Sequence, residues 1–248
     1  MQRLLEKAYH KNEIRRLDKK RAALETMALD HVARLERQAR QLRRAADALH
    51  IAACRRVRGA TEPAVPDGTI WASRAGPWAA PVSPASLCPV PTGSTFGTGL
   101  SLHHDGKLAD LSLVQETAQR EGGAPFWTSL DCLDFDGSYL SLALSIPEEI
   151  CTSLTAGDVI ALSMDVLVER PTQAYGRLNL RQGPNTETIV RDLDLSRSQT
   201  SVEFDLYYTD LESDQISSAW VDVIFEEPKM NRLLFRDVYL SRRRRADA

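Results

Sequence analysis

The stretch AWVDVIFEEPKMNRLLFRDVYL, Ala219–Leu240, decides the fold. In its first half, apolar and polar residues alternate with a period of two, which is typical of a half-buried β-strand. Proline cannot donate to a strand ladder, so Glu227-Pro228-Lys229 ends this strand. A second strand is expected at Leu233–Leu240, and because it is apolar on both sides it should lie inside a sheet beside another layer. We interpret the pair as the closing hairpin of an antiparallel sheet.

Short apolar segments separated by turn residues extend this pattern back to residue 100. Asp105-Gly106 tolerates the positive φ values of a type I′ turn, so residues 100–104 and 107–114 are expected to form a hairpin. Further strands are predicted at 125–135, 139–146, 159–168, 174–181, 187–195 and 201–208, with one or two helical turns at 147–154. No long helix intervenes, which predicts a mainly β fold, an antiparallel β-sandwich (jelly roll) over residues 100–241.

A basic segment precedes the predicted sandwich. Residues 1–58 contain 16 lysines and arginines against 7 aspartates and glutamates, whereas residues 59–241 contain 11 against 26. Residues 1–58 lack proline and glycine, so we expect a long basic N-terminal helix. Such an asymmetry between segments suggests that they have separate tasks.

The predicted helix has a partly apolar seam. Leu35, Leu42 and Leu49 are seven residues apart, and the same seam also holds Arg21, His31 and Gln38. Polar seam residues are compatible with a short coiled coil, because they fix register at a cost in stability. We expect a homo-oligomer or docking into a larger protein assembly. The alternatives are a solvated or membrane-surface helix and a helix that binds nucleic acid.

Residues 59–99 hold seven of the twelve prolines and are expected to form an extended connector. Trp71 and Trp78 lie within it, and tryptophans in an extended segment anchor it by burying area. We interpret 59–99 as a strap packed on the sandwich, with an aromatic ligand platform as the alternative. Residues 242–248, which begin with four arginines, are expected to form a basic tail.

The N-terminal residues lack the apolar core of a signal peptide, and no run of about eighteen apolar residues predicts a membrane span. The four cysteines are scattered, without a CxxC pair or a disulfide pattern. The expected location is therefore cytoplasmic, with reduced thiols.

Signatures of catalysis are missing from the sequence: there is no phosphate-binding glycine loop, HExxH, GxSxG or paired CxxC. His103-His104-Asp105 belongs to a predicted turn, and adjacent strand residues point to opposite faces. Asp131, Asp134 and Asp136 lack the glutamate that an EF-hand requires, although a structural calcium between loops stays an alternative. We predict no catalytic residue, no metal site and no cofactor.

The outer face of the sandwich carries the candidate ligand-binding residues. On the strand 174–181, Gly176, Leu178 and Leu180 are expected to point inward. The outward candidates on this and neighbouring strands are Tyr175, Arg177, Asn179, Arg181, Tyr207 and Trp220, with Glu203, Asp205 and Asp222 beside them. Aromatic planes together with planar amide, carboxylate and guanidinium groups are suited to sugars. A solvated or protein-contacting face is the alternative.

Three segments carry a resemblance to known domains. Residues 157–168 and 201–208, followed by Leu-Phe-Arg-Asp-Val-Tyr-Leu at 234–240, resemble the galactose-binding-like and carbohydrate-binding-module jelly rolls over residues 125–241. The whole chain also resembles an uncharacterised family of alphaproteobacterial proteins, which implies no activity. Motifs for the calcium ligands and sugar-stacking aromatics of those jelly rolls are not identifiable, so the resemblance carries over no specific ligand.

These observations favour a non-catalytic binding module, with a glycan as its ligand, presented on an oligomerising or docking helix. The first alternative is a structural scaffold without a small-molecule site, including a component of a phage-like particle. The second is a non-specific nucleic-acid-binding protein, which the acidic charge of the predicted sandwich disfavours.

Overall fold

The computed structural model describes residues 2–120, 122–209 and 216–245. It divides into two units, Met1–Leu49 and His50–Ala248, which are described separately below. Within the described part of the chain, every helix is too short or too polar to cross a membrane.

The first unit consists of helices, but not of the single helix that the sequence predicts. Helix α1 (Gln2–Ala22) and helix α2 (Leu29–Arg58), whose residues 50–58 belong to the second unit, are separated by the 3₁₀ turn η1 (Leu24–Thr26). The Thr26 hydroxyl donates to the Ala23 carbonyl, and Met27 is extended, with φ −88° and ψ 150°. A β-branched hydroxyl residue that bonds to the local backbone competes with helix formation, which accounts for the break.

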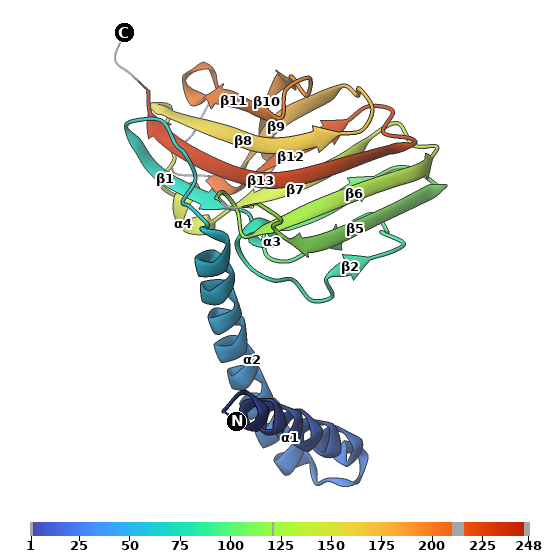
Figure 1. Ribbon diagram of the computed structural model, residues 1–248. Helices are drawn as coiled ribbons and strands as arrows, with labels where there is room; N and C mark the ends of the chain where they lie inside the picture. The colour runs from blue at the N-terminus through green and yellow to red at the C-terminus, as the bar shows by residue number, and fades with distance from the viewer. Residues whose placement is uncertain (1, 121, 210–215, 246–248) are drawn as a thin grey trace. The chain divides into compact units, whose positions relative to one another are not determined.

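The second unit is a sandwich of two antiparallel sheets, and the predicted mainly β fold is confirmed (Figure 1). The seven-stranded sheet has the order β11-β8-β13-β6-β5-β2, with β1 paired to β13. Its strands are β1 (Thr69–Arg74), β2 (Ser86–Leu87), β5 (Ala109–Thr117), β6 (Phe126–Phe135), β8 (Asp158–Val168), β11 (Gln199–Asp205) and β13 (Asn231–Arg244).

The six-stranded sheet has the order β10-β9-β12-β7-β4-β3. Its strands are β3 (Ser94–Thr95), β4 (Leu100–His104), β7 (Leu140–Ile146), β9 (Ala174–Gln182), β10 (Asn185–Leu193) and β12 (Ile216–Phe225). Short helical segments connect the strands: α3 (Gly76–Ala79), α4 (Glu148–Cys151) and η2 (Leu206–Tyr208).

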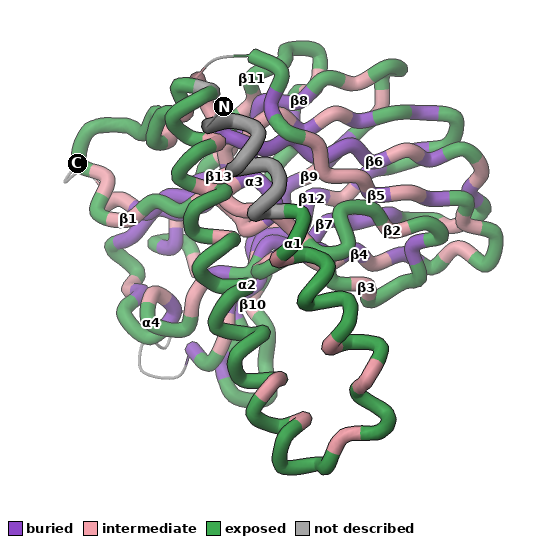
Figure 2. Tube along the Cα trace, turned by 60° about the horizontal axis from the view of Figure 1, so that its bottom comes forward, coloured by how far each residue is buried: buried purple, intermediate pink, exposed green. Residues whose placement is uncertain are grey.

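The core lies between the two sheets (Figure 2). Burial alternates along β4, whereas residues 126–130 of β6, 140–144 of β7 and 158–162 of β8 are buried in unbroken runs. Leu178 and Leu180 of β9 are fully buried, as the alternation predicts. Gly176 is also buried: a Cβ there would meet Phe204 Cζ at 3.1 Å and Val202 Cγ2 at 3.2 Å. The absence of a side chain at Gly176 therefore lets side chains from β11 pack closely against β9.

Both predicted hairpins are wrong, because each connection crosses from one sheet to the other. Strand β12 lies between β9 and β7, whereas β13 lies in the other sheet between β8 and β6. Glu227 and Met230 in the connection have positive φ values of 46° and 55°, and Pro228 between them lacks an N–H group, so the ladder cannot continue. The interior position predicted for the last strand is confirmed.

The chain crosses between sheets in the same way at Asp105-Gly106. Strand β4 pairs with β3 and β7, while β5 pairs with β2 and β6. The Asp105 carboxylate accepts hydrogen bonds from the backbone N–H groups of Ser138 and Tyr139 and from the Ser138 hydroxyl. These bonds hold the pKa of Asp105 below its usual value and join the crossing to the loop before β7.

Within 59–99, the chain contributes three short strands and a buried plug. Trp78 of α3 is completely buried, and its indole N–H donates to the Phe235 carbonyl at 3.0 Å. The Gln115 side-chain amide donates to the Pro77 and Ala80 carbonyls at 2.6 and 2.7 Å, which fixes the α3 turn. The packed strap is therefore what the structure shows at Trp78, which is not available as a ligand platform.

The terminal arginines are part of the sandwich, and β13 continues through Arg244. Arg242 is 5% exposed, and its Nη2 donates to the fully buried Asp158 carboxylate at 2.7 Å. Arg243 pairs with Glu203, and Arg245 pairs with Asp205. The positive charge expected of a free basic tail is therefore neutralised at these positions. The remainder of the predicted tail, residues 246–248, lies outside the described residues.

We predict that Trp78→Ala destabilises the sandwich by about 3–5 kcal/mol, because it removes a large buried side chain and leaves a cavity and an unpaired Phe235 carbonyl. The effect is measured by urea unfolding of the full chain. Unfolding is monitored by far-UV circular dichroism, because the substitution removes a tryptophan and would change a fluorescence signal. Leu133→Ala is the control, since Leu133 is 55% exposed and should change stability by less than about 0.5 kcal/mol. Equal midpoints for the two variants would contradict the plug role.

Candidate functional site

The outer face of the six-stranded sheet brings together most of the predicted ligand-binding residues. On β9, Tyr175, Arg177, Asn179 and Arg181 alternate with the buried inward residues. In the ladder with β12, Trp220 lies opposite Asn179, Asp222 opposite Arg177, and Ile224 opposite Tyr175. The side chains of these pairs share one face, because directly opposite residues of a ladder point the same way.

A groove of about 670 Å³ crosses this face between β9 and β4. It is lined by His103, Tyr139, Ser141, Ala143, Arg177, Trp220, Asp222 and Ile224. Ser141 and Ala143 of β7 are only 3% and 7% exposed although their side chains point outward. Because these two side chains are shorter than their neighbours, the sheet surface is depressed at β7, and Ser141 and Ala143 form the floor of the groove.

A buried polar network fixes one wall of the groove. Asp222 Oδ2 accepts hydrogen bonds from Arg177 Nε at 3.2 Å, Arg177 Nη2 at 2.8 Å and Asn179 Nδ2 at 2.9 Å. Asp222 and Asn179 are each 3% exposed, whereas the Arg177 side chain is 42% exposed. The carboxylate therefore orients a guanidinium group whose other N–H donors remain accessible from the groove.

Aromatic side chains supply other parts of the wall. Trp220 is half-buried and Tyr139 is 40% exposed, and both line the groove. His103 Nε2 lies 3.0 Å from the Ser101 hydroxyl, its ladder-face neighbour on β4. The groove thus combines aromatic surface, which packs against C–H groups, with oriented polar groups, which bond to hydroxyls.

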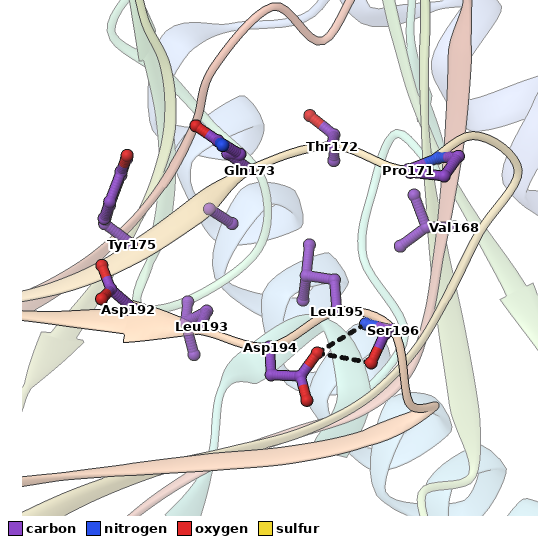
Figure 3. Close-up of a pocket in the computed structure, with 11 residues that line it drawn as sticks. Val168, Pro171, Thr172, Gln173, Tyr175, Asp192, Leu193, Asp194, Leu195 and Ser196 are labelled. Carbon is purple, nitrogen blue, oxygen red and sulfur yellow. Dashed lines mark hydrogen bonds between the residues drawn. The ribbon is translucent and has the colours of Figure 1, made fainter.

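A second hollow of about 660 Å³ opens at one end of the sandwich, between the β8–β9 and β10–β11 connections (Figure 3). We call it the end cleft. Tyr175 and Asp192, which are opposite one another in the β9–β10 ladder, stand together on one side of it. Asp194 accepts hydrogen bonds from the Ser196 N–H at 3.0 Å and from the Ser196 hydroxyl at 2.6 Å. The other residues that line the end cleft are Val168, Pro171, Thr172, Gln173, Ala174, Leu193 and Leu195.

The structure separates the predicted residues into four places. Arg177, Asn179 and Trp220 belong to the groove or to its polar network, and Tyr175 lines the end cleft. Arg181 is exposed on the same strand but does not line the groove. Tyr207 lies on η2, after β11 of the other sheet, with the Arg245 guanidinium 4.2 Å from its ring centroid. The structure therefore does not bring Tyr207 to the face that holds the others.

Five of the residues that line the groove are absent from the predicted set: His103, Tyr139, Ser141, Ala143 and Ile224. The sequence places His103 beside a turn, and the outward position of His103 becomes informative only when β4 is known to be the neighbour of β7. Tyr139 precedes β7, and its backbone N–H donates to Asp105. A signal for Tyr139 is present in the sequence, since an aromatic residue follows the loop Asp136-Gly137-Ser138.

The aspartates considered for calcium are engaged in other interactions. Asp131 pairs with Arg232 at 3.3 Å, Asp134 pairs with Lys229 at 2.5 Å, and Asp136 accepts from the Leu108 N–H at 2.9 Å. The Asp134–Lys229 pair lowers the pKa of the carboxyl group and raises that of the amine. Across residues 2–120, 122–209 and 216–245, no three histidine, cysteine, aspartate or glutamate side chains are grouped as metal ligands.

The chain belongs to a family of unknown function, DUF6478, whose model matches residues 1–248. A comparison with curated proteins finds no match.

Solved structures similar to the chain include other β-sandwiches. The C-terminal family 22 carbohydrate-binding module of Clostridium thermocellum Xyn10B is 7% identical, with a TM-score of 0.41, over 75% of this chain and 99% of the module. A module from a study of the promiscuous specificity of carbohydrate-binding modules of the β-sandwich superfamily is 10% identical, with a TM-score of 0.39, over 56% of each chain. The enzymatically active domain of bacteriophage CBA120 tailspike protein 4 is 8% identical, with a TM-score of 0.38, over 57% of this chain and 19% of that one. All three TM-scores are below 0.5, so these similarities add nothing to the strand order and groove given above.

We predict that Asp222→Ala destabilises the sandwich by about 1–3 kcal/mol, because the Arg177 guanidinium loses its carboxylate partner and the buried Asn179 amide keeps only the backbone carbonyls of Arg177 and Trp220 as acceptors. Chemical unfolding of the full chain measures this loss. Arg181→Ala, on the same outer face, is the matched control and should change stability by less than about 0.5 kcal/mol. A loss in Asp222→Ala no larger than in the control would show that the network contributes little.

Proposed function

We propose that the protein is a non-catalytic carbohydrate-binding module that holds a glycan in the groove of the six-stranded sheet. The observation that carries this proposal is the pairing of aromatic walls with a fixed guanidinium group. Trp220 and Tyr139 offer planar surface to the C–H face of a sugar ring, and Arg177 offers donors to hydroxyl oxygens. Because Asp222 holds Arg177 in place, little side-chain entropy is lost when a ligand binds.

The groove is better suited to binding than to hydrolysis. Glycoside hydrolysis ordinarily requires two carboxyl groups that flank the scissile bond. Among the residues that line the groove, Asp222 is the single carboxylate, and it is buried and bonded to Arg177 and Asn179. His103 is the other titratable group with acid–base capacity near the floor, and it lies beside the Ser101 hydroxyl.

The helical unit supports the second part of the proposal, which is self-association through the helices. Leu17, Leu24, Val32, Leu35 and Leu42 line an apolar hollow between α1 and α2. Several of these side chains remain accessible, with Leu17 49% and Leu42 58% exposed, and Leu49 farther along α2 is 73% exposed. The proposed occupant is a second copy, since the seven-residue spacing of Leu35, Leu42 and Leu49 matches that of helices that pack together.

The glycan proposal is tested on an array of glycans that includes bacterial capsule and envelope polysaccharides. It predicts that a variant of the groove loses glycan binding, whereas a variant outside the groove does not. For every glycan that the wild-type protein binds, Trp220→Ala should lower the affinity about tenfold or more, since it removes the largest aromatic surface of the groove. Tyr207→Ala, an exposed aromatic outside the groove, should bind as wild type does. No binding by wild type to any glycan would favour the scaffold alternative, and equal binding by Trp220→Ala would place the ligand elsewhere.

The assembly proposal predicts a concentration-dependent mass above that of the monomer in light scattering of the full chain. Leu42→Lys should shift the chain to monomer, because a charge in an apolar contact is costly to bury. Gln41→Lys adds the same charge at the neighbouring exposed position and should leave the mass unchanged. A monomeric wild type at micromolar concentrations would contradict self-association.

A further inference from the structure

The groove and the end cleft adjoin each other at one residue pair. Ile224 of β12 lines the groove, and Tyr175 of β9 lines the end cleft. These two residues are directly opposite in the β12–β9 ladder, and the Cβ atoms of opposite residues lie about 5 Å apart. A ligand that reaches Ile224 along the groove therefore meets Tyr175 at the next strand.

A single row of outward residues connects the two hollows. The ladder pairs place His103 opposite Ser141, Ser141 opposite Ile224, Ile224 opposite Tyr175, and Tyr175 opposite Asp192. The row thus crosses β4, β7, β12, β9 and β10 in order. Four strand spacings of about 4.8 Å make roughly 19 Å. One sugar ring cannot span this row, whereas a chain of several rings can.

Tyr175 is suited to the junction between the hollows. Its side chain and that of Asp192 stand together at one side of the end cleft (Figure 3). Desolvation and the nearby Glu226 carboxylate raise the pKa of the Tyr175 phenol. A hydrogen bond from the phenol to Glu226 contributes to this shift, so what Tyr175 offers a ligand is the flat surface of its ring and the acceptor capacity of its oxygen.

The charges along the row oppose an anionic ligand. In the groove, the charge of Arg177 is balanced by Asp222. At the end cleft, Asp192 and Asp194 line the hollow, and Glu226 lies close enough to affect Tyr175. Arg197 acts on Asp194 and offsets part of this charge. Carboxylate or sulfate groups on a ligand would be desolvated against like charges, which is unfavourable.

We infer that the ligand is an uncharged oligosaccharide or polysaccharide segment that crosses the strands from His103 to Asp192, with several linked sugars in the groove and a further sugar at Tyr175 in the end cleft. This inference rests on the proposed function, and it adds the ligand's charge, its minimum length and its direction across the sheet. Uronic-acid and sulfated polysaccharides are excluded as ligands. Binding should strengthen with chain length until the row is filled.

The experiment uses the full chain and two panels of probes. Affinity electrophoresis is run in gels that contain neutral polysaccharides (mixed-linked β-glucan, xylan, galactan, galactomannan, dextran) or anionic ones (alginate, polygalacturonate, hyaluronan). Oligosaccharides of the retarding neutral polymer, from disaccharide to hexasaccharide, are then titrated by calorimetry. The variants are Tyr175→Ala, Trp220→Ala and the control Tyr208→Ala, whose side chain is 75% exposed outside both hollows.

We expect at least one neutral polymer, and none of the anionic ones, to slow the migration of the wild-type protein in the gel. Tyr175→Ala should weaken hexasaccharide binding about tenfold and change disaccharide binding less than twofold, whereas Trp220→Ala should weaken both. Tyr208→Ala should match wild type. Circular dichroism establishes that each variant is folded.

Three results would overturn the inference. Retardation by an anionic polymer contradicts the charge argument. The chain argument is contradicted if affinity for a neutral glycan does not rise with chain length, or if Tyr175→Ala leaves that affinity unchanged at every length. After either the charge or the chain argument fails, the groove proposal still holds if Trp220→Ala weakens binding. Absence of retardation by every polymer removes the proposed function and the inference together.

Discussion

The contact between Phe225 and Phe235 joins the two sheets, and the rest of the structure depends on it. Phe225 ends β12 in one sheet and Phe235 lies in β13 of the other, with ring centroids 6.1 Å apart. Trp78 packs edge-on against Phe235 at 6.2 Å. All three side chains are at most 1% exposed. Burial of these large aromatic surfaces fixes which face of each strand points inward.

The position of the groove follows from this core contact. Because side chains alternate along a strand, an inward Phe225 requires Ile224, Asp222 and Trp220 to point outward. A slip of one residue in β12 would bring Asp222 into the core and would turn Phe225 to solvent. The same register that closes the sandwich therefore also aligns Asp222 with Arg177 across the ladder.

Strand positions were predictable from the sequence, whereas strand partners were not. Periodicity located β6, β7, β8, β9 and β10 to within two residues at each end, because apolar alternation and turn residues are local properties. Pairing is not local. Pro228 and Asp105-Gly106 mark the ends of strands, but the same residues can serve a hairpin or a crossing between sheets, and only packing of the whole chain distinguishes them.

The candidate site shows the same division between local and non-local information. Arg177, Asn179 and Trp220 were predicted because an outward position depends only on alternation within one strand. His103 and Tyr139 reach the groove through the order β12-β7-β4, which no single strand encodes. Tyr207 was assigned to a strand by its sequence, but the ladder ends at Asp205, whose carboxylate accepts from the Tyr207 N–H and turns the chain into η2.

Charge pairing decides which surfaces remain available to partners. The four arginines at 242–245 are paired with three carboxylates, Asp158, Glu203 and Asp205, and Asp158 is shared by Arg242 and Arg244. These pairs leave an excess of carboxylates on the sandwich, since residues 59–241 carry 26 acidic against 11 basic side chains, while residues 1–58 carry 16 basic against 7 acidic. Two sandwiches of like charge repel each other at low ionic strength. The helical segments carry a net charge of one sign as well, so in the self-association proposed above the exposed leucines, and not the charges, favour a contact between helices.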